Sequence, residues 1–226
     1  MATADYRDSA GLIEIPPSAY TLEGFTEWTY SEAFPEQGRI TFVDGRILID
    51  MSPERYESHS KIKAVIYGVL VPFIYEQDLG EFYPDGARFK NESANISNEP
   101  DALFASWQTL ESGKLTPPPF DVVPEGQHID LCGSPDWVCE VLSNSSVTKD
   151  KKLLLESYHK ASIPEYWLID ARGDEIDFQI LVWQTDGYVA VNDEDDWNFS
   201  PVFDRHFQMT RDLNRVGRWR YHLKIR

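Results

Sequence analysis

A short apolar stretch from Val138 to Leu142, with turn residues on both sides, constrains the fold of this chain most strongly. Such a stretch is typical of a strand that is buried on both faces of a sheet. Side chains alternate along a strand, so Glu140 shares an otherwise apolar face with Val138 and Leu142. A glutamate is rarely buried without a partner, so we expect its carboxylate to meet a cation. This cation is either a basic side chain in a structural salt bridge, the simpler interpretation, or a metal ion.

At 226 residues, the chain has the length of one domain with a full hydrophobic core. Its two cysteines, Cys132 and Cys139, lie close together, and one is on the buried strand, which argues against a disulfide scaffold or a zinc cluster and indicates a reducing compartment. The first 20 residues lack an apolar signal core, and the longest apolar run, residues 64–75, contains Pro72 and is too short to span a bilayer. We therefore expect a cytoplasmic protein with no membrane contact.

The chain is strongly acidic, with a net charge of -17. A charge of this sign repels a polyanion such as nucleic acid. The distribution is uneven, because residues 205–226 contain seven Lys or Arg and one acid and so carry +6, which leaves -23 on residues 1–204. With Phe207, Trp219 and Tyr221 among them, residues 205–226 fit either a surface for a phosphate backbone or a solvated end strand, and the second interpretation is the simpler.

The order of helix and strand patterns predicts one α/β domain around a mixed sheet flanked by helices. Residues 1–20 are interpreted as a flexible N-terminal arm. Asp44-Gly45 joins two strand-like runs and is the strongest short hairpin signal in the chain. Residues 58–75 fit an amphipathic helix that Pro72 should kink or shorten, and residues 107–131, with three consecutive prolines, fit a long surface excursion. Further helices are expected at residues 22–34 and 148–161, and further strands at residues 102–105, 138–142, 166–169, 175–183 and 188–191.

Two acids occupy comparable places, since Asp101 opens one short buried strand and Glu140 lies within another. This pattern resembles the PD-(D/E)XK nuclease superfamily and, within it, the Uma-two family of restriction endonuclease-like proteins, from about Leu22 to Thr210. Each motif that carries the resemblance is weak by itself, whereas their ordered set is specific. In chain order these motifs are Val43-Asp44-Gly45, Met51-Ser52-Pro53, His59, Glu99-Pro100-Asp101, Ser134-Pro135-Asp136, Glu140-Val141-Leu142-Ser143 and Ile163-Pro164-Glu165-Tyr166-Trp167-Leu168-Ile169-Asp170.

The resemblance implies a restriction-endonuclease-like domain over residues 21–210, with the hairpin and the C-terminal strands as additions and residues 211–226 as a basic tail. It also implies that Asp101 and Glu140 bind Mg²⁺, for which Mn²⁺ can substitute, with waters and the Val141 carbonyl completing the shell. Asp50 is a candidate third ligand. From the residues alone, Asp101 and Asp50 also fit plain roles as caps of a turn or strand.

The resemblance further implies a lysine near the attacking water, and here the chain departs from the expected pattern. The superfamily's basic pattern places this lysine two residues past the strand acid, where the chain has Leu142, and many family members place it at the position of Leu154. Lysines are instead available on the following helix, where Lys149 is the leading candidate and Lys152 lies on the same face. Thr41 stands where family members often carry another acid.

The resemblance implies Mg²⁺-dependent hydrolysis of phosphodiester bonds in nucleic acid, and we expect DNA rather than RNA as the substrate and a homodimer that cuts both strands. One alternative is a catalytically degenerate nuclease fold that binds nucleic acid or protein without cutting, which Thr41, the two leucines and the acidic charge favour. A further alternative is a hydrolase of small phosphate esters. His59 is interpreted as a helix cap or a packed residue, and Tyr158, Tyr166 and Trp167 are interpreted as core.

Overall fold

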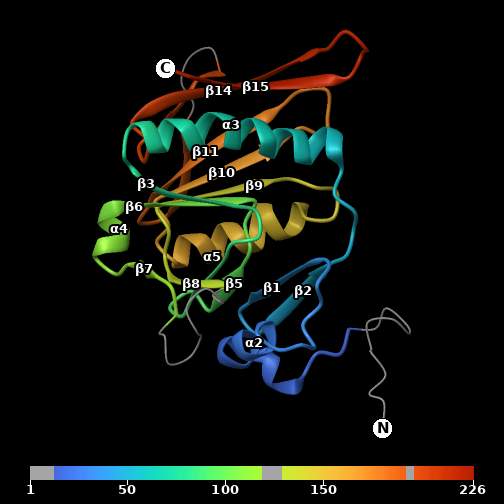
Figure 1. The fold of residues 1–226 in the computed structure, drawn as a ribbon, viewed down its shortest axis with the longest axis vertical. Coiled ribbons are helices and arrows are strands. Elements are labelled where there is room, and N and C mark those ends of the chain that lie inside the picture. The colour runs from blue at the N-terminus through green and yellow to red at the C-terminus, as the bar shows by residue number, and fades with distance from the viewer. Residues whose placement is uncertain (1–12, 119–128, 192–195) are drawn as a thin grey trace.

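The computed structural model describes residues 13–118, 129–191 and 196–226 of the chain. Figure 1 shows that they are stacked in layers, with a β-ribbon and a long helix over one sheet, and a shorter helix and a second sheet beneath it. Helix α2 (Leu22–Thr29) lies at the far end of this stack, and the Thr21 hydroxyl caps it by accepting a hydrogen bond from the Gly24 N–H. No helix within the described residues is long and apolar enough to cross a membrane.

The central sheet has the strand order β12-β11-β10-β9-β6-β3. Strands β9 (Trp137–Val141) and β10 (Glu165–Asp170) run parallel, and the other neighbours pair antiparallel, so the sheet is mixed as the sequence predicts. Every residue of β9 is buried, because core residues cover both faces of the sheet. The other strands are β3 (Gly80–Pro84), β6 (Ala102–Ser106), β11 (Asp177–Gln184) and β12 (Gly187–Val191).

One face of the central sheet packs against helix α3 (Lys61–Glu76), whose other side lies under a three-stranded sheet. The side chains of Trp137 and Trp167 are fully buried on this face, edge to face, with ring centroids 5.2 Å apart. Helix α3 continues past Pro72 to Glu76, and the carbonyl that Pro72 leaves without a helical hydrogen bond belongs to Gly68, which is exposed to solvent. The three-stranded sheet consists of β13 (Asn198–Ser200), β14 (Arg205–Leu213) and β15 (Trp219–Ile225).

The opposite face is covered by helix η3 (Lys149–Leu154), which continues as α5 (Leu155–Lys160), and by a second six-stranded sheet. The predicted hairpin forms one edge of that sheet, and its turn residues Asp44 and Gly45 have φ angles of 48° and 76°, as this two-residue turn requires. The hairpin is therefore part of a larger sheet rather than a separate addition. In spatial order the strands are β2 (Arg46–Asp50), β1 (Arg39–Val43), β5 (Ile96–Asn98), β4 (Arg88–Asn91), β8 (Asp130–Gly133) and β7 (Leu115–Thr116).

The predicted arm and surface excursion fall only partly within the described residues. The end of the arm contains the short helix η1 (Pro17–Tyr20), in which Ala19 is buried against the α2 core. The excursion begins with helix α4 (Trp107–Glu111) and includes β7 and β8, so it has more regular structure than expected. Residues 1–12 and 119–128, and most of the acidic cluster at residues 193–196, lie outside the described residues. The division at residue 210 falls within β14, and the proposed division into arm, domain and tail stays a prediction.

Glu165 on β10 makes the stability of this fold depend on pH. Its carboxylate is fully buried and accepts hydrogen bonds from Trp167 Nε1, the Ser200 hydroxyl and the Val202 N–H. Burial outweighs these bonds and raises the pKa of Glu165 from 4.5 to about 7. The folded state therefore binds this proton more tightly than the unfolded state does, so the resulting stabilisation is complete below pH 4.5 and is lost as the pH rises through about 7.

We expect Glu165→Gln to remove this part of the pH dependence. The free energy of unfolding of the variant should fall by about 3 kcal/mol less than that of the wild type between acidic and mildly alkaline pH. Urea denaturation at a series of pH values measures the difference, with Glu111→Gln as a control at an exposed position. Parallel wild-type and Glu165→Gln curves would contradict the prediction.

Candidate active site

Strand pairing brings the two predicted carboxylates, Asp101 and Glu140, to one place. Ala102 of β6 pairs with Cys139 of β9, and Asp101 directly precedes Ala102. The Val141 N–H, one residue after Glu140, donates a hydrogen bond of 2.6 Å to Asp101 Oδ2. Both carboxylates are only 1% exposed. The two strands therefore hold a buried pair of acids at the end of β9.

Three basic side chains surround Asp101. Arg39 Nη2 lies 2.9 Å from Oδ1, and His59 Nε2 lies 3.3 Å from Oδ2. Lys63 Nζ is 3.8 Å from Oδ1. Burial alone raises the pKa of Asp101, but His59, Arg39 and Lys63 outweigh it and hold this pKa well below its usual value. Asp101 is therefore ionised at neutral pH.

The same cations are shared with two outer acids, Glu54 and Asp85. Arg39 Nη2 is 3.2 Å from Asp85, and Lys63 Nζ is 2.5 Å from both Asp85 and Glu54. His59 Nδ1 bonds to Glu54. Burial lowers the pKa of His59, but Asp101 and Glu54 more than compensate and raise it. The cations thus form one network, which couples the buried Asp101 to the surface.

Glu140 is held differently, by neutral donors. Its Oε1 accepts hydrogen bonds from Asn98 Nδ2 (3.0 Å) and from the Tyr158 hydroxyl (2.6 Å). The Thr41 hydroxyl in turn donates to Asn98 Oδ1, so the position where an acid is expected is linked to Glu140 through an amide. Within the described residues, no basic side chain lies within ion-pair distance of Glu140. The interpretation of Glu140 as part of a structural salt bridge is therefore wrong.

This environment keeps the Glu140 side chain mostly protonated, and so uncharged, at pH 7. Burial raises its pKa from 4.5 to about 8, Lys149 partly opposes this shift, and Asp150 and Asp101 add to it. Two adjacent acids thus have pKa values displaced in opposite directions. Such a pair is typical of functional sites, although structural networks also produce it.

The two candidate lysines on helix η3, Lys149 and Lys152, differ in burial. Lys149 opens η3, its side chain is 14% exposed, and its Nζ lies 3.4 Å from Asp150 Oδ1. Burial lowers the pKa of Lys149, but Glu140, Asp150 and Asp101 raise it above its usual value, so the ammonium lies in the field of both site acids. Lys152 is exposed. The helix begins as a π-helix, in which a spacing of three residues does not return to the same face.

Asp50 lies at the rim of the site. Its carboxylate accepts hydrogen bonds from the Ser52 N–H (2.9 Å) and from the Ser145 hydroxyl (2.7 Å), which follows β9. Burial raises the pKa of Asp50, but Ser52, Ser145 and the nearby Lys149 lower it on balance. Asp50 thus caps its turn and ties β2 to the end of β9.

Leucines occupy the two positions where the resemblance to the family leads us to expect a lysine. Leu142 and Leu154 are both fully buried in the core between the two sheets. Tyr158, Tyr166 and Trp167 are also fully buried, as predicted, and Tyr158 contributes its hydroxyl to the site.

The sequence interpretation missed Arg39, Lys63 and Asn98. His59 and Lys63 are four residues apart at the start of the α3 segment, and this spacing was a usable signal that both face the same side. His59 is packed, as expected, and it also contacts Asp101. Arg39 and Asn98 left no such signal in the sequence. Only the pairing of β1 with β5 brings these two residues near the acids of the site.

The site fits a hard divalent cation in some respects. Asp101 Oδ1 is buried and accepts no hydrogen bond, and both hydrogen bonds to Glu140 are accepted by Oε1. Carboxylate oxygens are the ligands that Mg²⁺ prefers. Among the residues that the structure describes, however, no group of three His, Cys, Asp or Glu side chains is arranged to hold a metal ion. Any metal bound here would thus depend on two carboxylates and on water.

Comparisons with known proteins agree with the fold. The Uma2 family model, described as "Putative restriction endonuclease", matches residues 22–212. The crystal structure of a "putative nuclease belonging to DUF820" from Anabaena variabilis is similar with a TM-score of 0.53 and 18% identity, over 81% of this chain and 90% of that chain. The comparison with curated proteins found no match. The expected nuclease-like α/β fold is thus confirmed, and a similarity at this identity bears on fold alone.

Proposed function

The chain belongs to the Uma2 family of restriction endonuclease-like proteins, and on that premise we propose that it hydrolyses phosphodiester bonds of nucleic acid with the help of Mg²⁺. The observation that carries this proposal is the buried pair Asp101 and Glu140, with the Lys149 ammonium in its field. Phosphodiester hydrolysis needs a charge-stabilised phosphate and an activated water, and such a group of residues suits both needs.

Asp101 and Glu140 would hold the metal ion, and Mn²⁺ would substitute for Mg²⁺. The ion would supply charge neutralisation at the phosphate and lower the pKa of a bound water. The shifted pKa of Glu140 supports this assignment, because burial, Asp150 and Asp101 disfavour its charge, and a nearby divalent cation would remove that penalty. Asp50 at the rim is a weaker candidate, since its oxygens already accept hydrogen bonds from Ser52 and Ser145.

The chain's own residues have separate roles in this proposal. Asn98 and Tyr158 fix Glu140 Oε1 and so orient the carboxylate. Lys149 attracts the phosphate group or the attacking water beside Glu140, and Lys152 is too exposed for the same task. Arg39 and His59 position Asp101 and shield its charge. Preorganised charges of this kind in a water-poor site stabilise charge that develops during the reaction.

A second candidate is a nuclease-fold protein that binds its partner without cutting. The observation that favours it is Arg39, whose guanidinium lies 2.9 Å from the Asp101 oxygen that the metal would need. The buried Leu142 and Leu154 at the family's lysine positions point the same way. In this alternative, the arginine takes the place of the metal, and the network stabilises the fold.

Metal removal tests the proposal directly. We expect the wild type to nick supercoiled plasmid or to cut single-stranded oligonucleotides at low salt in Mg²⁺ or Mn²⁺, and to lose this activity in EDTA, because the metal supplies the charge neutralisation. Parallel calorimetric titration with Mn²⁺ should show binding. A folded protein that neither binds Mn²⁺ nor cuts would support the second candidate, and cleavage of chromogenic phosphodiesters alone would indicate a small substrate.

DNA as the substrate, the cytoplasmic location and the homodimer stay predictions. Light scattering at working concentration measures the oligomeric state, and a comparison of DNA with RNA oligonucleotides of the same sequence identifies the preferred polymer.

A further inference from the structure

The β14–β15 hairpin is the most basic part of an acidic chain. Residues 205–226 carry +6, while residues 1–204 carry -23. A polyanion is repelled by most of this molecule, so any surface that receives it should lie where the basic side chains are concentrated.

The hairpin is a rigid element. Its inner face is anchored by Phe207, Met209, Tyr221 and Leu223, which are buried in the core over α3. The turn is ordered as well, because Asn214 Oδ1 accepts hydrogen bonds from the N–H groups of residues 216 and 218. A preorganised surface loses little conformational freedom when a ligand binds.

The tip of the hairpin, defined here as residues 211–220, carries four arginines and one aspartate. Every residue from 215 to 220 is exposed. The apolar side chains of Leu213 and Val216 are 57% and 72% exposed, and Trp219 is 37% exposed. Exposed apolar and aromatic groups among arginines are the composition that nucleic acid surfaces use, because sugars and bases pack on the former while phosphates bind the latter.

The arginines of the tip are not equally available. Arg211 bonds to the carbonyls of residues 171 and 173 and stacks over Trp219, with 4.2 Å from its guanidinium carbon to the ring centroid. Arg220 is paired with Asp212. Within the described part of the chain, the side chains of Arg215 and Arg218 make no hydrogen bond and no ion pair. Both guanidinium groups are therefore open to phosphates, and Arg218 also attracts the nearby Glu57 carboxylate, whose pKa the pairing with Lys61 and the charge of Arg218 lower.

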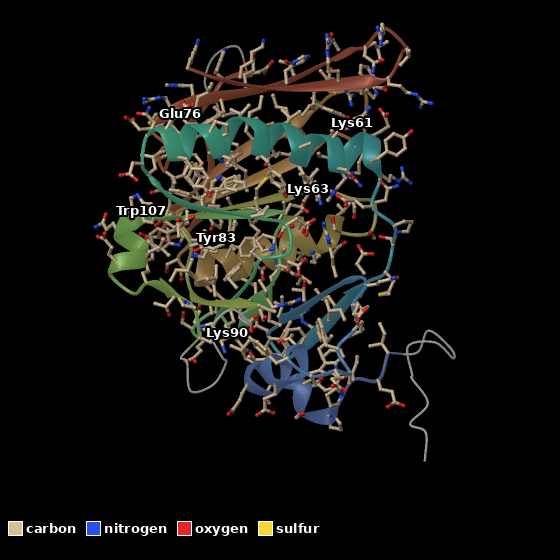
Figure 2. All side chains as sticks on the ribbon, viewed as in Figure 1. Lys61, Lys63, Glu76, Tyr83, Lys90 and Trp107 are labelled. Atoms are coloured by element: carbon tan, nitrogen blue, oxygen red, sulfur yellow. The ribbon has the colours of Figure 1, made fainter. Side chains whose placement is uncertain are left out.

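The tip lies over the end of α3 whose other side borders the candidate active site. Lys61 Nζ, on the side of α3 that faces the hairpin, donates a hydrogen bond of 2.9 Å to the carbonyl of Trp219, whereas His59 and Lys63 contact Asp101 on the other side. Figure 1 shows the turn between β14 and β15 over the start of α3, and Figure 2 labels Lys61 and Lys63 at that same end of the helix. The tip and the site thus lie at the same end of α3 but on opposite sides of it, so a polynucleotide strand that contacted both would pass around this end of the helix.

We propose that the hairpin tip docks the sugar-phosphate backbone of a polynucleotide and leads it to the Asp101–Glu140 pair. The second half of this statement rests on the proposed nuclease function, whereas the first half does not. A second copy of the acidic chain is the competing occupant, because its surface is also negatively charged.

The test is charge reversal at Arg215 and Arg218. We expect the R215E/R218E double variant to bind fluorescent duplex and single-stranded oligonucleotides at least about tenfold more weakly in EDTA, because reversal adds repulsion to the lost phosphate contacts. The slope of log affinity against log salt should become shallower by about two. The matched control is K114E/K160E, which makes the same change in net charge outside the hairpin.

The outcomes separate the two proposals. Wild-type affinity in R215E/R218E, or an equal loss in K114E/K160E, would overturn docking at the tip even if the protein cuts nucleic acid. If binding depends on the tip but the protein never cuts, docking at the tip is supported and the proposed nuclease function is wrong. If light scattering shows a dimer that R215E/R218E abolishes while oligonucleotide affinity is unchanged, the partner is a second copy and the docking proposal is wrong.

Discussion

Replacing Glu140 by glutamine is expected to lower phosphodiester cleavage by roughly 10²–10³-fold, because a metal ion that loses one of two carboxylates supplies several kcal/mol less stabilisation. The same change should make the metal-free protein more stable at alkaline pH. The pKa of Glu140 is raised from 4.5 to about 8 by burial, so its contribution to stability is present below pH 4.5 and is lost as the pH rises through about 8. Glutamine keeps the oxygen that Tyr158 and Asn98 contact and carries no charge.

At a pH above 8, the gain for Glu140→Gln should be of the order of 3–5 kcal/mol, and it should shrink towards zero near pH 4. Urea denaturation in EDTA at both pH values measures it, and plasmid nicking in Mg²⁺ measures the activity. Glu156→Gln, at an exposed position of α5, is the control for a change of one charge. Unchanged cleavage in Glu140→Gln would show that Glu140 is not part of the active site. Lower stability of this variant at alkaline pH would show that the Glu140 carboxylate is paired with a cation.

Asp101→Asn should lower cleavage to a similar extent, but with the opposite effect on stability. Asp101 is the buried partner of Arg39, His59 and Lys63, and these cations hold its pKa below the usual value. Its stabilisation is therefore present above the ordinary aspartate pKa and is lost only in acid. Removing one member of a buried ion pair leaves an uncompensated charge, so we expect a loss of roughly 3 kcal/mol at neutral pH.

The matched control is Asp85→Asn. Asp85 contacts the same Arg39 and Lys63, but its side chain is 30% exposed, so water can replace it and the loss of stability should be smaller. Both variants are measured by urea denaturation at neutral pH. If Asp101→Asn and Asp85→Asn cost the same, or if Asp101→Asn is as stable as the wild type, Asp101 does not organise the cation network.

Opposite stability effects with the same loss of activity would identify two carboxylates with different tasks. Asp101 would keep the cations in place, whereas Glu140 would be held at a cost to stability that only a bound cation relieves. Residues that are retained at such a cost are commonly functional. Both variants therefore need a folding measurement beside the activity assay, because loss of cleavage alone does not distinguish them.

The sequence by itself determined the features that depend on neighbours along the chain. The alternation around Glu140 predicts a strand buried on both faces, and Asp44-Gly45 predicts the hairpin turn, because side-chain direction and turn conformation are local properties. The ordered motifs predict the family, and they place Glu140 within one strand and Asp101 at the start of another, which the structure shows to be its neighbour.

Only the tertiary structure decided how those acids are charged. Arg39, His59 and Lys63 reach Asp101 from three separate elements, and Asn98 reaches Glu140 from the second sheet. The hairpin tip meets Lys61 across a large separation in sequence in the same way. Burial and electrostatic interactions depend on distances in space, which short-range patterns of residues do not encode, so the two neighbouring acids acquired opposite pKa shifts.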